Sequence, residues 1–146
     1  MGAVRFFLLA ALFLAACATS APPSVPAQLR GCWIAREPER TVTMRWFPQG
    51  AAWRGDQLFY DKAGGEPAHQ AYRIEANNGA NAQGGWTICP LDDGLPHGAP
   101  CRALSFGPSS EDYHAELVAT ADHLHFAWVD EGEETILFDG ARDGCD

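Results

Sequence analysis

The chain has 146 residues, which is enough for one domain with a single core and too few for two domains of ordinary size. It carries 10 Lys and Arg residues against 19 Asp and Glu residues, a formal net charge of −9. Because a phosphate backbone is bound mainly through clustered basic side chains, this composition excludes nucleic acid as a partner. The acidity keeps the domain soluble, and as an alternative it would steer a basic protein or a cationic ligand towards the surface.

The first 16 residues have the pattern of a cleaved export signal. Arg5 provides a positive charge, and residues 6–13 form an apolar run shorter than the roughly 20 residues needed to cross a bilayer. Residues 14–17, Leu-Ala-Ala-Cys, resemble the lipobox of bacterial lipoproteins, in which cleavage leaves the cysteine lipidated at the new N-terminus. The resemblance predicts a lipid anchor on Cys17, and Ala18 after it implies the outer membrane, facing the periplasm. The alternative is an ordinary secretory signal that leaves Cys17 as a spare thiol.

Residues 17–28 follow as a lipidated tether before the folded domain. Pro22, Pro23 and Pro26 lie among small residues, a composition that favours an extended, semi-rigid spacer. We therefore expect three parts: a signal peptide at 1–16, a tether at 17–28 and one domain at 29–146.

Alternation of apolar and polar residues, typical of half-buried strands, runs through this domain. In residues 41–47 it places Val42, Met44 and Trp46 on one face. Strand patterns bounded by Gly, Pro, Asn and Asp recur at residues 32–36, 52–60, 70–76, 85–89 and 102–106. No helical period is sustained, so the sequence predicts an all-β fold.

The last third of the chain predicts an antiparallel meander with a defined register. A turn at 120–123 would place Leu117 opposite Phe126 and Ala115 opposite Trp128. A three-residue hairpin loop at 130–132 would place Phe126 opposite Ile136 and Leu124 opposite Phe138. Both turns bury the same face, so we expect one wall of the core to contain Leu117, Leu124, Phe126, Trp128, Ile136 and Phe138.

Four cysteines remain after Cys17, an even number that argues for two disulfides in an exported domain. Three pairings are possible. We favour Cys89 with Cys101, which bracket a loop rich in turn residues, and Cys32 with Cys145, which would join the two ends of a closed barrel. The alternative of a zinc site at Cys89, His97 and Cys101 lacks a fourth ligand.

Short strands separated by turns favour an antiparallel up-and-down barrel of about eight strands, because closure removes exposed sheet edges. Gly31 and Trp33 form a Gly-x-Trp pattern that resembles the start of the first strand in lipocalin and lipocalin-like proteins. The resemblance implies that Trp33 packs across one end of the barrel and that a basic side chain, here Arg142, covers it. The domain is short and ends without room for the usual C-terminal helix, so we expect a compact lipocalin-like lipoprotein rather than a true lipocalin.

An eight-stranded barrel is either filled by its own side chains or holds one small ligand. The bulky inward side chains favour a filled interior. The alternative is an apolar cavity with a tyrosine as its polar group. The candidate ligand-binding residues are Trp46, Tyr60, Tyr72, Phe106, Phe126 and Trp128.

Catalytic and metal-binding patterns are weak in this sequence. It contains no Gly-x-Ser-x-Gly, no His-Glu-x-x-His and no phosphate-binding glycine loop. His123 and His125 share one strand face at a spacing that can bind a metal, with His123 facing Asp139 and His125 between Val118 and Leu137. They lie opposite the apolar face, so a solvated surface is the favoured interpretation. Asp139, Asp143 and Asp146 lack the ligand spacing of a calcium loop.

These features together predict a binding protein without an enzymatic activity, a cofactor or a metal. The expected function is that of a lipid-anchored cell-envelope lipoprotein whose small barrel binds a small apolar ligand. The alternative is an acidic protein-binding module, such as a lysozyme-inhibitor-type lipoprotein, which would use the acidic residues 130–134 to bind a basic protein.

Overall fold

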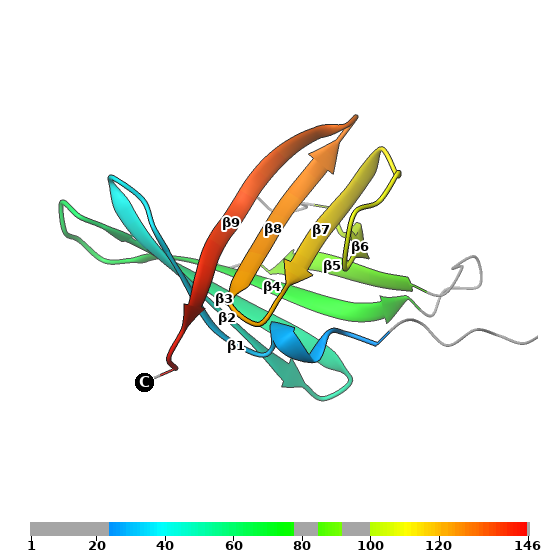
Figure 1. Ribbon diagram of the computed structural model, residues 1–146, viewed down its shortest axis with the longest axis horizontal. Helices are drawn as coiled ribbons and strands as arrows, with labels where there is room; N and C mark the ends of the chain where they lie inside the picture. The colour runs from blue at the N-terminus through cyan, green and yellow to red at the C-terminus, as the bar shows by residue number, and fades with distance from the viewer. Residues whose placement is uncertain (1–23, 78–84, 92–99, 146) are drawn as a thin grey trace, which may run out of the picture.

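The computed structural model describes residues 24–77, 85–91 and 100–145. Within these ranges a short 3-10 helix precedes nine strands that close into a barrel in chain order, with β9 returning to β1 (Figure 1). The elements are η1 (Ala27–Leu29), β1 (Gly31–Arg36), β2 (Arg40–Gln49), β3 (Ala52–Asp61), β4 (Ala68–Asn77), β5 (Gly85–Leu91), β6 (Arg102–Ser105), β7 (Tyr113–Ala119), β8 (His123–Asp130) and β9 (Glu133–Asp143). The all-β barrel is confirmed, with nine strands where about eight were expected.

One pair of strands departs from the expected antiparallel order. β6 and β7 run parallel, with Leu104 opposite Ala115 and Ser105 opposite Glu116. A parallel pair needs a connection that travels back along the sheet, which residues 106–112 supply. Pro108 in this connection has no N–H to give to a strand ladder, which disfavours a tight hairpin here. The barrel is therefore mixed, and the fully up-and-down prediction is wrong at this pair.

The predicted register of β7 against β8 is confirmed. Leu117 lies opposite Phe126, and Ala115 lies opposite Trp128. Leu117 and Phe126 are fully buried, as the alternation of apolar residues requires.

The predicted register of β8 against β9 is wrong, because the turn is shorter and β9 contains a bulge. The turn has two residues, Glu131 and Gly132, both with positive φ (51° and 81°), as a hairpin turn of type I′ requires. Pairing then shifts, from Ala127 opposite Ile136 to Phe126 opposite Phe138, which leaves Leu137 as the extra residue of the bulge.

The shifted register changes which side chains are buried. Ile136 turns outward and is 58% exposed, so its predicted place in the core is wrong. Phe138 regains the inward direction beyond the bulge but lies opposite Phe126, while Leu124 lies opposite Gly140.

Trp33 is fully buried next to η1 and is held from two sides. Its indole Nε1 donates a hydrogen bond to the Leu29 carbonyl at 3.3 Å. The Arg142 guanidinium lies 4.0 Å from the centre of its ring and donates hydrogen bonds to the carbonyls of Gln28, Arg30 and Ala121. This is the arrangement that the sequence led us to expect for Trp33 and Arg142.

Gly31 is required by this contact. Its φ is 141°, and a Cβ there would come within 2.5 Å of Arg142 Nη1. A side chain at position 31 would therefore displace the guanidinium from the ring of Trp33.

Both predicted disulfides are confirmed. Cys32 in β1 is bonded to Cys145 beyond β9, and Cys89 in β5 is bonded to Cys101 before β6. The first bond joins residues 113 positions apart and so restricts the unfolded chain strongly.

Replacing Trp33 by alanine tests its structural role. Because the side chain is fully buried, we expect Trp33→Ala to destabilise the protein by about 3–5 kcal/mol. Thermal unfolding followed by circular dichroism should then show a midpoint lower by on the order of 10–20 °C. Tyr60→Ala is the control, because Tyr60 is 43% exposed and should change the midpoint little. Equal midpoints for the two variants would contradict the role of Trp33.

Candidate functional site

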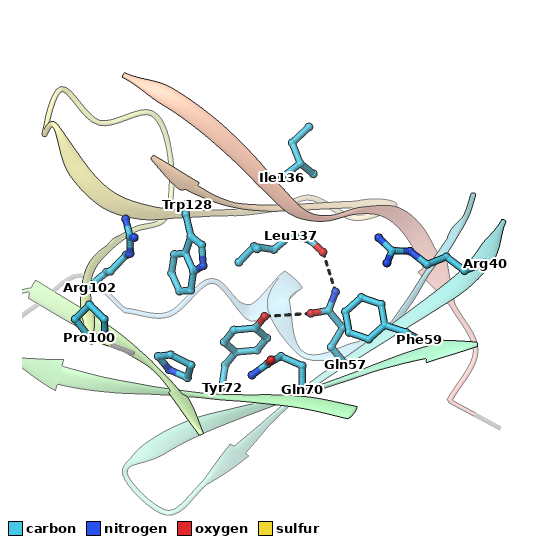
Figure 2. Close-up of a pocket in the computed structure, with 11 residues that line it drawn as sticks. Arg40, Gln57, Phe59, Gln70, Tyr72, Pro100, Arg102, Trp128, Ile136 and Leu137 are labelled. Atoms are coloured by element: carbon cyan, nitrogen blue, oxygen red, sulfur yellow. Dashed lines mark hydrogen bonds between the residues drawn. The ribbon is translucent and has the colours of Figure 1, made fainter. Parts of the chain in front are cut away.

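A pocket of about 310 Å³ opens at the end of the barrel where β8 ends and β9 begins. Figure 2 shows the side chains that line it. Its volume is close to the lower limit of small-molecule sites, which is about 300 Å³. It is lined by Arg40, Gln57, Phe59, Gln70, Tyr72, Pro90, Pro100, Arg102, Trp128, Ile136 and Leu137.

A buried polar pair forms the inner part of this pocket. Gln57 is fully buried, and its Nε2 donates a hydrogen bond to the Leu137 carbonyl at 2.8 Å. Tyr72 donates its hydroxyl hydrogen to Gln57 Oε1 at 3.2 Å (Figure 2). Leu137 is the residue that the bulge removes from the pairing of β8 with β9, so the Gln57 amide supplies a partner for its carbonyl.

The protonation state of Tyr72 is fixed by its surroundings. Burial raises the pKa of the Tyr72 hydroxyl above its usual range, because the charged phenolate would lose hydration. Tyr72 is therefore a neutral donor throughout the physiological pH range, and its oxygen keeps lone pairs that can accept a further hydrogen bond.

Two arginines line the pocket, each stacked on an aromatic ring. The Arg40 guanidinium lies 5.1 Å from the ring centre of Phe59, and that of Arg102 lies 5.0 Å from the ring centre of Trp128. Arg40 also pairs with Glu37 at 2.7 Å, and Arg102 pairs with Asp130. Stacking holds each guanidinium beside an aromatic ring at the edge of the pocket.

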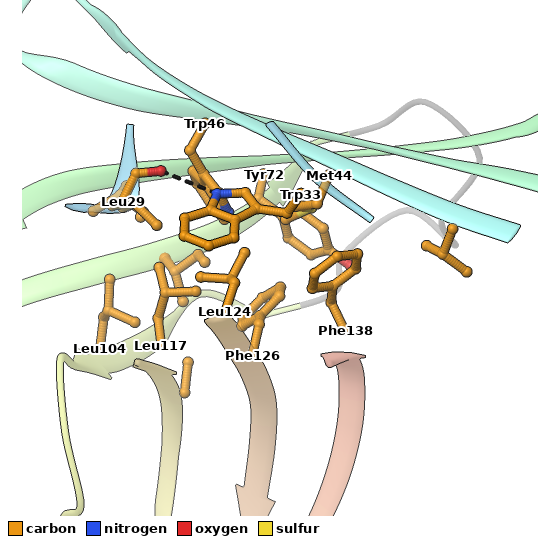
Figure 3. Packing of buried hydrophobic residues seen from close by; sticks show 14 of the residues in the cluster. Leu29, Trp33, Met44, Trp46, Tyr72, Leu104, Leu117, Leu124, Phe126 and Phe138 are labelled. Carbon is orange, nitrogen blue, oxygen red and sulfur yellow. Dashed lines mark hydrogen bonds between the residues drawn. The ribbon is translucent and has the colours of Figure 1, made fainter. Parts of the chain in front are cut away.

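The rest of the interior is filled by side chains (Figure 3). Phe126 lies at the centre of an aromatic cluster, with ring centres 6.2 Å from Trp46, 5.0 Å from Tyr72 and 5.3 Å from Trp128. Gly55 makes room for this cluster, because a Cβ at that position would lie 2.6 Å from the Trp46 ring. The barrel is thus filled around Trp46 and Phe126 and hollow beside Tyr72 and Trp128.

The six residues predicted to bind a ligand are therefore divided among different places. Tyr72 and Trp128 line the pocket, while Trp46 and Phe126 lie in the core behind it. Phe106 packs against Trp86, with ring centres 6.3 Å apart, beside a different hollow.

The expectation that Tyr60 lines the interior is wrong. Phe59, one position earlier in β3, has the inward direction, so Tyr60 turns to the outer face, where it is 43% exposed. The same alternation identifies Gln57, which the sequence analysis missed: it is two positions before Phe59 and two after Gly55.

His125 lies on the outer face of β8, between two carboxylates of β9. Its Nδ1 is 2.9 Å from Asp139 Oδ2, and its Nε2 is 2.5 Å from Glu134 Oε1. The predicted neighbour Val118 is confirmed, but Asp139 takes the place predicted for Leu137, because the shorter turn and the bulge each shift the register by one residue. His123 reaches the same Asp139 carboxylate at 3.3 Å, although Ala141 lies opposite it in the ladder.

These contacts favour the charged form of His125. Partial burial opposes the charge, but the hydrogen bonds to Asp139 and Glu134 and the negative charges of these groups raise the pKa of His125 above its usual value. Only an imidazolium can donate from both ring nitrogens at once. Across the residues that the structure describes, no group of three or more His, Cys, Asp or Glu side chains is arranged to hold a metal ion.

His97 and Asp146, which belonged to the zinc and calcium patterns considered above, lie outside the described residues. In the described part of the chain, no helix is long and apolar enough to cross a membrane.

Comparisons with family models, with curated proteins and with solved structures gave no match to this chain.

The charge of His125 predicts a pH dependence of stability. Its folded pKa is raised, so its contribution is fully present below the unfolded pKa of about 6.5 and is lost as the pH rises through the folded value. We expect the free energy of unfolding, measured by urea denaturation, to fall as the pH rises above about 6.5, and we expect His125→Gln to make that fall smaller.

His123→Gln is the control, because it removes the more exposed imidazole beside the same Asp139. It should keep most of the pH dependence. The same pH dependence in the wild type and in His125→Gln would refute the assignment to His125.

Proposed function

We propose that this protein is a lipid-anchored lipoprotein of the cell envelope whose small, lipocalin-like barrel binds a small, largely apolar ligand. The pocket of about 310 Å³ carries this proposal, because it combines aromatic and aliphatic walls with a buried Gln57–Tyr72 pair. Ligand sites are typically apolar concavities with a few fixed polar groups of this kind. The proposed role is binding rather than catalysis.

The polar pair has hydrogen-bonding capacity to spare for a ligand. Gln57 gives one Nε2 hydrogen to Leu137 and is fully buried, whereas Tyr72 is 4% exposed and its oxygen can still accept a hydrogen bond. A ligand with one polar group could use this capacity for orientation while its apolar part rests on Phe59 and Trp128. Most of the affinity would come from the apolar contact.

The proposed location rests on the N-terminal sequence and agrees with the cysteine chemistry. Two disulfides in a small domain are usual in oxidising compartments and rare in the cytosol. A lipid on Cys17 and the tether at 18–28 would hold the barrel at the outer membrane, facing the periplasm. The Trp33–Arg142 contact supports the lipocalin-like assignment.

A second candidate function is binding of a basic protein, such as a lysozyme, through the β8–β9 turn. Glu131, Glu133 and Glu134 are exposed there, and Tyr113, 57% exposed, donates a hydrogen bond to Glu131. An acidic rim with an exposed tyrosine is the composition that favours a basic partner. A lysozyme inhibition assay separates this function from ligand binding.

Cys17→Ser tests the lipid anchor. Without the thiol no thioether can form, so the variant should incorporate no labelled palmitate and should move from the membrane fraction to the soluble envelope fraction. Continued incorporation of palmitate would refute lipidation at Cys17. Wild-type protein labelled in parallel is the positive control.

Gln70→Trp tests the pocket. Gln70 lines the pocket and is partly exposed, so a larger side chain there should occupy the space without disturbing the core. We expect affinity for the neutral fluorescent probe N-phenylnaphthylamine to fall by at least about tenfold, as loss of a main contact surface does. Gln49→Trp, the same change at an exposed position of β2, should bind like the wild type. No binding by the wild type, or equal binding by both variants, would refute the pocket as the site.

A further inference from the structure

In the part of the chain that the structure describes, the charged residues that line the pocket are two arginines. Arg40 belongs to β2 and Arg102 to β6, strands that lie on opposite sides of the closed barrel. Figure 2 shows them at opposite ends of the pocket. Among the described residues that line the pocket, none is acidic. In a chain with a formal net charge of −9, this places two positive charges around one apolar hollow.

Each guanidinium keeps donors for a further partner. Arg102 donates through Nη1 to Asp130, and Arg40 donates through Nε to Glu37. A guanidinium has five N–H groups, so each of these hydrogen bonds uses a small part of the set. Stacking on Trp128 and on Phe59 covers the flat faces and leaves the edges available, which is where carboxylates bind.

The carboxylates already present do not block this use. The Arg40 and Glu37 side chains are 45% and 44% exposed, and exposed ion pairs of this kind contribute little to stability. Asp130 is also 45% exposed. An incoming acid group can therefore replace Glu37 at small cost, and at the more buried Arg102, which is 23% exposed, it can share the guanidinium with Asp130.

The surface between the two arginines is apolar or neutral. Phe59, Trp128 and Leu137 form the walls, and the Gln57–Tyr72 pair carries no charge. A ligand with a single acid group would satisfy one arginine and leave the other paired only with its own carboxylate.

We propose that the pocket takes an elongated ligand with an acid group at each end and an apolar middle, bound by Arg102 at one end and Arg40 at the other. This inference rests on the proposed function, since it specifies the chemical class of the ligand for the same pocket. The negative charge of the whole chain disfavours anions in general, so selective binding of such a ligand must come from these two local groups.

Three probes of equal chain length test the inference: decanedioate with two acid groups, decanoate with one, and decanol with none. Each is titrated into the purified full-length chain by calorimetry. We expect decanedioate to bind about fivefold more tightly than decanoate, and decanoate more tightly than decanol. Raising the salt concentration should reduce the difference between the first two probes.

Two variants assign the ends of the ligand. Arg40→Gln should lower the affinity for decanedioate to that of decanoate and lower the affinity for decanoate by no more than about twofold, because the single acid group of decanoate can still pair with Arg102. Arg73→Gln is the matched control, since Arg73 is similarly exposed but pairs with Glu75 away from the pocket. It should bind all three probes as the wild type does.

The outcomes separate this inference from the proposed function. Equal affinity for decanedioate and decanoate overturns the two-ended ligand while the pocket remains a ligand site. Equal affinity for all three probes overturns charge recognition altogether. Failure of every probe to bind, together with failure of N-phenylnaphthylamine, overturns the proposed function and this inference with it.

Discussion

Closure of the barrel depends on the pairing of β1 with β9, and the contact between Trp33 and Arg142 is the centre of that pairing. The two residues lie opposite each other in the ladder, and the guanidinium covers the indole while it binds three backbone carbonyls from η1, its C-cap and the β7–β8 turn. The Cys32–Cys145 disulfide fixes the same strand pair one step further out. Because the first and last strands pair here, the sheet has no unpaired edge strand that would have to be covered.

Closure also determines where a pocket can exist. A barrel of this size encloses little more volume than its own side chains occupy. At the Trp33 end this volume is filled by Trp46, Phe126 and the buried residues around them. At the other end, the bulge at Leu137 removes one backbone carbonyl from the ladder and turns it towards Gln57. A buried amide in an apolar barrel is costly unless it is hydrogen-bonded on both sides, and here Leu137 and Tyr72 provide those bonds. The pocket is lined by the same three residues.

The sequence predicted what depends on composition and period. The all-β fold, both disulfides, the register of β7 against β8 and the positions of Trp33 and Arg142 follow from alternation, cysteine number and a short motif. Predictions from the sequence were wrong where a single residue changes the strand register or the side of the sheet that a side chain faces. The register of β8 against β9 is shifted by one residue at the two-residue turn, Glu131 and Gly132, and by one more at the bulge, Leu137. The alternation of apolar and polar residues within one strand does not show which residue of the partner strand lies opposite, so it could not predict either shift. Tyr60 was misplaced and Gln57 was missed for the same reason, because the inward phase of β3 is set by packing of Gly55 against Trp46.

The part of β9 that contains the bulge makes polar contacts on both of its faces. Glu134 precedes Leu137 by three residues and Asp139 follows it by two, and His125 bridges their carboxylates on the outer face. On the inner face Gln57 binds the Leu137 carbonyl, which borders the pocket. His123 contacts the same Asp139 carboxylate. On the neighbouring β7, Glu116 lies near His114. The carboxylates that contact His125 therefore belong to β9. The segment of β9 that shapes the pocket is thus held from outside by an ion-paired imidazolium and from inside by a buried amide.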